Sequence, residues 1–121
     1  MERTMTQETY NPQRMKWLLA VTTQQIVRGG TEGLETGIKY IESCLENTAN
    51  TPYEPALQEA KKKIGVALFY QRSMQAIDAL YGNTLQWYSL RTDRQRSLQA
   101  AERTIFQVSK AIDQTQPRLA A

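Results

Sequence analysis

The side chains that most often perform catalysis are scarce in this sequence. It contains no histidine and one cysteine, Cys44, so the usual general base, most zinc sites, a Cys–His nucleophile pair and an internal disulfide are all missing. Glu42 and Glu46 stand four residues apart, but the Glu-x-x-His pattern of di-iron bundles requires histidine. We expect a solvated acidic face there, no metal or cofactor, and no enzymatic activity. An enzyme that uses carboxylates alone is a minor alternative.

Basic side chains offer a different chemistry. Arg96, Arg103 and Lys110 are seven residues apart, so on a helix they form one stripe with about 10.5 Å between neighbours. Such a row suits a nucleic-acid backbone, because each neutralised phosphate releases counterions whatever the base. The alternative is that these are ordinary exposed cations that keep an amphipathic helix soluble.

Other basic residues extend the predicted interface. Lys61 and Arg72 are eleven residues apart and are expected to form one basic strip along their helix. Trp87 and Tyr88 could stack on bases, but their apolar neighbours favour packing in the core or at an interface. The complete predicted nucleic-acid-binding set, which carries no base code, is Lys61, Lys62, Lys63, Arg72, Arg91, Arg94, Arg96, Arg103 and Lys110.

Charge is unevenly distributed along the chain. The 15 basic and 12 acidic residues give a net charge of +3. Residues 1–59 have a net charge of −3, and residues 60–121 have a net charge of +6. The acidic half of one copy could therefore attract the basic half of the next, and stacked copies would align their basic stripes. We expect self-association in several copies.

Local signals in the first half predict two helices. Asn11-Pro12 has the form of an N-cap followed by a first-turn proline, and Gly29-Gly30 ends the apolar periodicity that follows. Thr31 is expected to cap a second helix, in which Leu34 begins an apolar seam at helical spacing. Both segments have the length of ordinary globular helices.

A third, longer helix is predicted after Thr51-Pro52-Tyr53-Glu54, which has the form of a capping box. It runs to Tyr81 and is apolar nearly all round, which predicts burial at the centre of a bundle. Gly82-Asn83 predicts a break. A short helix over 84–90 is expected next.

The final predicted helix is capped by Asp93, has an apolar seam from Leu98 to Ile112, and ends at Pro117. No alternating strand pattern occurs. The predicted fold is all-α: a compact helical bundle of four long helices plus one short helix, with a long buried central helix. One domain is expected over 11–116, between a flexible N-terminal tail at 1–10 and a frayed C-terminus at 117–121.

Taken together, these features resemble the small helical subunit of CRISPR–Cas effector complexes, Cascade-like or type III-like. The resemblance lies in the long helix from Pro55 to Tyr81, the seam from Leu98 to Ile112, and the cations Arg91, Arg94, Arg96, Arg103 and Lys110. It implies a subunit that acts in antiviral defence, contacts larger protein subunits, and supports guide RNA or the target strand in a ribonucleoprotein. The acidic second helix departs from a uniformly basic surface, and a contact between subunits would account for it.

No segment approaches the roughly 20 apolar residues that cross a bilayer, and residues 1–10 lack the apolar run of a secretory signal. We expect a cytoplasmic protein with a reduced thiol and no membrane partner. The alternative function is a helical adaptor or chaperone that grips a partner's helix through Trp87, Tyr88 and Leu90, with no nucleic acid.

Overall fold

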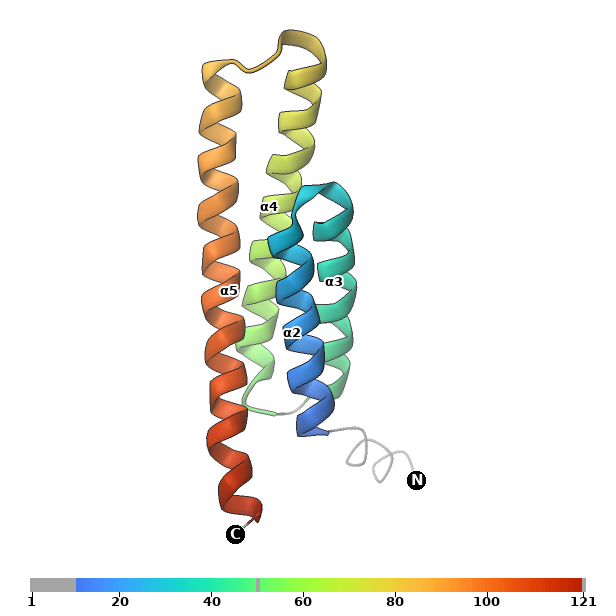
Figure 1. Cartoon of the computed structure of the whole chain (residues 1–121), viewed down its shortest axis with the longest axis vertical. Coiled ribbons are helices and arrows are strands. Elements are labelled where there is room, and N and C mark those ends of the chain that lie inside the picture. Colours follow the sequence, from blue (N-terminus) through green and yellow to red (C-terminus); the bar gives the residue numbers. More distant parts are fainter. Residues whose placement is uncertain (1–10, 50, 121) are drawn as a thin grey trace.

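The described part of the chain folds as an up-and-down bundle of four helices (Figure 1). The computed structural model describes residues 11–49 and 51–120, with side chains as far as residue 114. The helices are α2 (Pro12–Arg28), α3 (Gly30–Asn47), α4 (Glu54–Tyr81) and α5 (Leu85–Ala120). The described residues contain no strand, and the predicted all-α bundle is confirmed. The tail expected at residues 1–10 lies outside the described residues.

The first two helices begin and end where local signals place them. The Asn11 side-chain oxygen accepts hydrogen bonds from the backbone N–H groups of Gln13 and Arg14, at 3.0 and 3.1 Å. Gly29 and Gly30 have φ values of 79° and 72°, a left-handed region that glycine enters freely, so α3 starts directly after α2. Thr31 does not cap α3 as expected, because Gly29 occupies the N-cap position.

The helices α2 and α3 approach each other at two glycines. A Cβ atom at Gly33 would lie 2.6 Å from the carbonyl oxygen of Gln25, and one at Gly37 would lie 2.8 Å from Cγ2 of Ile26. Both glycines are buried. The close packing of this hairpin therefore requires residues without side chains on the facing side of α3.

Gly33→Ala is expected to destabilise the fold by about 1–3 kcal/mol, because the added methyl group can be accommodated only by moving the backbone of α2. Gly65→Ala in α4 is the matched control. Its Cβ would meet nothing within 4 Å, so the higher helix propensity of alanine should stabilise the fold by about 0.5–1 kcal/mol. Urea unfolding checks both values. Equal shifts of the unfolding midpoint in the same direction would contradict the close contact.

The start of α4 differs from the expected capping box. The helix begins at Glu54 with Tyr53 as N-cap, which makes no side-chain capping bond. Thr51 lies in the preceding turn, where its hydroxyl donates to the carbonyl of Thr48 at 2.6 Å and accepts from the N–H of Tyr53 at 3.3 Å. Thr51 therefore stabilises the turn between α3 and α4 and does not cap the helix.

The last two predicted helices are a single helix, α5. Thr84 caps it, since its hydroxyl accepts from the N–H of Trp87 at 3.2 Å. Asp93 lies inside the helix and forms a 3.9 Å ion pair with Arg96. An aspartate in a helix costs only some tenths of a kcal/mol, so it need not mark a boundary. The helix also continues past Pro117, which was expected to end it, for less than one turn.

The core lies between the facing sides of all four helices, and the predicted seam of α5 is part of it through Ala101, Ile105, Val108 and Ile112. The prediction that α4 is buried nearly all round is wrong. One face of the helix is buried, whereas Phe69 and Leu80 are 66% and 73% exposed. Leu80 is exposed because α2 and α3, with 17 and 18 residues against 28 in α4, end below it. Phe69 lies within the length that α3 covers, since Arg72 further along α4 still contacts Glu35, and it is exposed because it projects away from the core.

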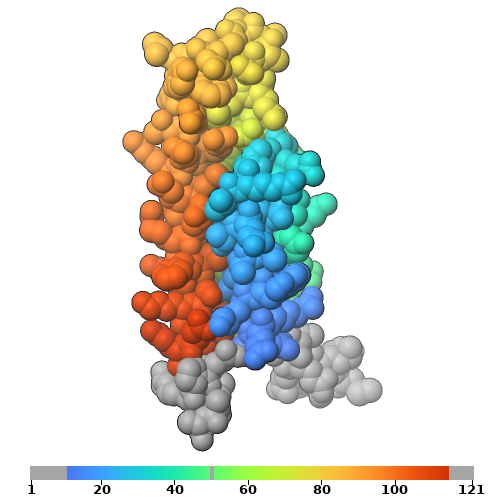
Figure 2. Space-filling model, in the orientation of Figure 1, coloured from blue at the N-terminus to red at the C-terminus, as the bar shows by residue number. Residues whose placement is uncertain are grey.

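The upper part of α4 and α5 therefore extends beyond the α2–α3 turn. We call residues 73–94 the overhang, which consists of the end of α4, the Gly82 turn and the start of α5. Gly82 has a φ of 77° and ends α4 as predicted. The overhang rises above the α2–α3 turn in both views (Figures 1 and 2), and its base still contacts that turn, since Gln75 accepts a hydrogen bond from Thr31.

Candidate nucleic-acid interface

The outer side of α5 carries the predicted basic stripe. Arg96, Arg103 and Lys110 are all exposed, and the α5 residues on the opposite side of the helix form the core seam. The Arg96 side chain is 77% exposed and lies 3.9 Å from Asp93. Within the described residues, the side chains of Arg103 and Lys110 form no ion pair or hydrogen bond. Two of the three cations are thus unengaged.

An exposed aromatic side chain interrupts this row of cations. Phe106 lies three residues after Arg103 and four before Lys110, which places it on the same helical face, and it is 66% exposed. The sequence spacing shows that Phe106 alternates with the cations, but Phe106 was not included in the predicted nucleic-acid-binding set. We call Arg96, Gln99, Arg103, Phe106 and Lys110 the α5 face.

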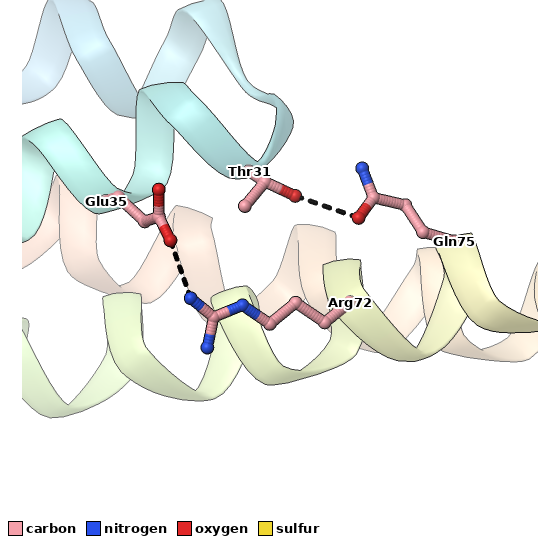
Figure 3. Close-up of polar contacts among 4 residues, drawn as sticks. All are labelled: Thr31, Glu35, Arg72 and Gln75. Carbon is pink, nitrogen blue, oxygen red and sulfur yellow. Dashed lines mark hydrogen bonds and ion pairs between the residues drawn. The ribbon is translucent and has the colours of Figure 1, made fainter.

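The predicted basic strip of α4 faces the acidic helix α3. Lys61 lies 3.2 Å from Glu42, and Arg72 lies 2.6 Å from Glu35. One turn beyond Arg72, the hydroxyl of Thr31 donates to the side-chain oxygen of Gln75 at 3.1 Å, and Figure 3 shows these last two contacts side by side. We call these three contacts the α3–α4 ladder.

The ladder changes the interpretation of the charge asymmetry. Glu35 and Glu42 pair with cations of the same chain, whereas Glu32 and Glu46 on the same helix are exposed and form no ion pair with a described residue. Attraction of α3 to the basic half of another copy stays a prediction. The charges of Lys61 and Arg72 are partly neutralised by the ladder pairs. These two residues lie together, as the eleven-residue spacing predicted, but on a different helix from the α5 face.

The three adjacent lysines of α4 do not form one surface. Successive residues of a helix project about 100° apart, so Lys61, Lys62 and Lys63 point in three directions. Lys63 pairs with Glu59 at 3.8 Å, and its carbonyl accepts a 2.7 Å hydrogen bond from the hydroxyl of Ser97. Lys62 is exposed.

Arg91 and Arg94 are separated from the stripe. On the continuous α5, Arg94 precedes Arg103 by nine residues and so projects about 180° away from it, toward α4. Its guanidinium donates to Gln71, its Nε is buried without a partner, and burial lowers its pKa, with a smaller effect from the charge of Arg91. Arg91 lies 5.9 Å from the ring centre of Trp87.

These two arginines line a cleft between α4 and α5 at the overhang. The other residues that line this overhang cleft are Gln71, Met74, Gln75, Asp78 and Trp87. Trp87 also contacts Tyr88 edge to face, with ring centres 5.0 Å apart. The predicted interface is therefore divided into the α5 face, the α3–α4 ladder and the overhang cleft.

Of the candidate catalytic groups, Cys44 is buried and Glu42 is paired, whereas Glu46 is exposed. Burial raises the pKa of the Cys44 thiol to about 12, so it is protonated at neutral pH and a poor nucleophile. Glu42 belongs to the ladder. Among the described residues, no three histidine, cysteine, aspartate or glutamate side chains lie together as a metal site would require. In the same residues, no helix combines the length and apolar character needed to cross a membrane.

Comparison with known proteins finds no matching family model, no similar curated protein and no similar solved structure. The resemblance to the small subunit of CRISPR–Cas complexes stays a prediction from the sequence.

Proposed function

We propose that the protein is a non-catalytic subunit of a cytoplasmic nucleoprotein complex and binds nucleic-acid backbone through the α5 face, without base specificity. The observation that carries this proposal is the pair Arg103 and Lys110, exposed cations that no described side chain engages. The cations of the α3–α4 ladder, in contrast, already have carboxylate partners. The α5 face is therefore the stripe whose positive charge is least neutralised within the chain and most available to a polyanion.

Arg96 can join this pair. Its contact with Asp93 is long and exposed, and surface ion pairs contribute only about 0–1 kcal/mol, so a phosphate can replace the aspartate at little cost. Phe106 adds a stacking surface, which favours single strands because their bases are free to stack on aromatic side chains. Three phosphate contacts on a single strand correspond to a salt slope of about −2.

The setting that we propose is the small helical subunit of a CRISPR–Cas effector complex. Guide RNA or the target strand would supply the backbone, and larger subunits and further copies of the chain would supply the protein contacts. Three features support this setting: the 28-residue α4, the apolar seam of α5, and the exposed cations opposite that seam.

The test is the binding of a fluorescent single-stranded oligouridylate at several salt concentrations, followed by anisotropy. We expect log Kd to vary with log salt with a slope of magnitude about 2, and Arg103→Ala and Lys110→Ala each to reduce that magnitude by about 0.7. Lys61→Ala is the control and should leave the slope unchanged. A slope near zero for the parent, or the same reduction in the control, would refute binding through the α5 face.

The alternative is an adaptor that binds a partner protein's helix and no nucleic acid. The observation that favours it is the exposed apolar end of the overhang, where Tyr81 and Leu85 are 75% and 89% exposed. Binding of a protein helix that does not change with salt, together with no binding of oligouridylate, would support the adaptor.

A further inference from the structure

The overhang cleft has the composition of a protein interface. Met74 and Trp87 line it together with Arg91 and Arg94, and tryptophan, methionine and arginine are enriched at the centres of such interfaces. In the lower half of the bundle, α2 and α3 cover α4 and α5, but they end before the overhang (Figure 1). The cleft is the place where that cover stops.

The charges in the cleft are unpaired and of both signs. Neither Arg91 nor Arg94 forms an ion pair with a described residue, and Arg94 donates only to the neutral side chain of Gln71. Asp78 is exposed and forms no ion pair with any described residue. A surface that presents both an unpaired carboxylate and unpaired guanidinium groups is complementary to a second copy of itself.

The positions of these charges match a two-fold arrangement. Because α4 and α5 are antiparallel and Arg94 contacts Gln71, Arg91 is level with Met74. Asp78 then lies four residues, or about 6 Å, closer to the Gly82 turn than Arg91. A two-fold axis between those levels crosses the overhang near its middle. It brings Asp78 of each copy to the level of Arg91 in the other.

We propose that two copies of this chain pair through their overhangs, antiparallel about this axis, so that α4 and α5 of both copies form a second four-helix bundle. Asp78 of each copy faces Arg91 and Arg94 of the other. Of the 22 residues 73–94, those that line the overhang cleft face the other copy. This proposal rests on one part of the proposed function, the contacts between copies of the chain. It does not depend on the other part, the binding of nucleic acid.

The ends of the overhangs also find a place in this pairing. The tip of one copy, with the exposed side chains of Tyr81 and Leu85, reaches the α2–α3 turn of the other. A hollow of about 220 Å³ lies at that turn, and Val27 and Leu98 contribute its accessible apolar lining. Arg94 lines both this hollow and the overhang cleft, so the two recesses adjoin and form one continuous surface.

Sedimentation velocity of the full chain, without nucleic acid, tests the pairing. The parent should be dimeric, and Asp78→Arg and Arg91→Asp should each weaken the dimer at least tenfold, because like charges then face each other twice. An equimolar mixture of the two variants should form a heterodimer, since each Arg–Arg or Asp–Asp contact is replaced by an Arg–Asp contact. Lys62→Asp, an exposed change in α4 outside the overhang, is the control and should dimerise like the parent.

Circular dichroism checks that the variants keep the helical fold. The proposal would be overturned if the parent stayed monomeric at a protein concentration of about 100 μM. It would also be overturned if the mixture of Asp78→Arg and Arg91→Asp stayed monomeric. A parent protein that dimerises but does not bind oligouridylate would refute nucleic-acid binding and leave this inference standing. The two failures are therefore distinguishable.

Discussion

Ile105→Asp is expected to unfold the protein, whereas Phe106→Asp leaves it folded. The two residues are neighbours in α5, but Ile105 is 2% exposed and Phe106 is 66% exposed. An aspartate at 105 loses the apolar burial of isoleucine, about 2–5 kcal/mol, and places an unpaired carboxylate in the core at a cost of several kcal/mol more. The sum is comparable with the whole stability of a small domain.

Far-ultraviolet circular dichroism and urea unfolding measure this contrast. We expect Ile105→Asp to lose most of its helical signal at 25 °C, and Phe106→Asp to unfold within about 0.5 kcal/mol of the parent. Ile64→Asp, at a fully buried position of α4, should behave like Ile105→Asp. A soluble Ile105→Asp variant with the helicity and midpoint of the parent would contradict the assigned core.

The second large effect concerns binding. Replacing Arg96, Arg103 and Lys110 together by alanine is expected to weaken oligouridylate binding roughly 100-fold at low salt, at about 1 kcal/mol per backbone contact. The matched control replaces Lys61, Lys63 and Arg72 by alanine. Both triple variants lower the net charge of +3 by three, so they differ only in the surface from which the charge is removed.

The control should bind within about threefold of the parent, because its three cations are paired with glutamates. It should lose at most a few kcal/mol of stability, at about 0–1 kcal/mol for each exposed pair. Fluorescence anisotropy and urea unfolding provide the two readouts. Equal losses of affinity in both triple variants would mean that net charge alone drives binding and that the α5 face has no special role.

Several helix ends could be predicted because their causes are local. Asn11 caps α2 through its own side chain, and Gly29 and Gly82 end helices with positive φ values. Thr51 and Asp93 carry similar local signals but do not cap helices. The hydroxyl of Thr51 donates to Thr48, and Asp93 lies within a helix that continues on both sides. A capping residue permits a helix start but does not impose one.

The extent of burial could not be predicted for α4. Its apolar residues extend around most of the helix, but α2 and α3 are too short to cover its upper end. Which residues remain exposed depends on the relative lengths and register of four helices. That information is tertiary, so Leu80 beyond the end of α3, and Phe69 on the outward side of α4, were expected in the core and are found at the surface.

In the candidate site, too, features that depend on local spacing could be predicted and features that depend on tertiary packing could not. A seven-residue spacing was enough to align Arg96, Arg103 and Lys110, because it depends only on the helical period. Arg94 was grouped with them as an extension of the positive charge toward the preceding turn. Because it follows the expected cap at Asp93, its nine-residue spacing from Arg103 already predicted the opposite side of the same helix. The pairing of Arg72 with Glu35 depends on the register of α3 against α4, which no local pattern reports.

The most direct test of the central claim is to map the contact itself by chemical-shift changes in isotope-labelled protein titrated with oligouridylate. We predict the largest changes at the backbone and side-chain signals of Arg103, Phe106 and Lys110, with the signals of Glu35 and Arg72 unchanged. Changes centred on the α3–α4 ladder, or no changes at millimolar oligonucleotide, would contradict nucleic-acid binding through the α5 face.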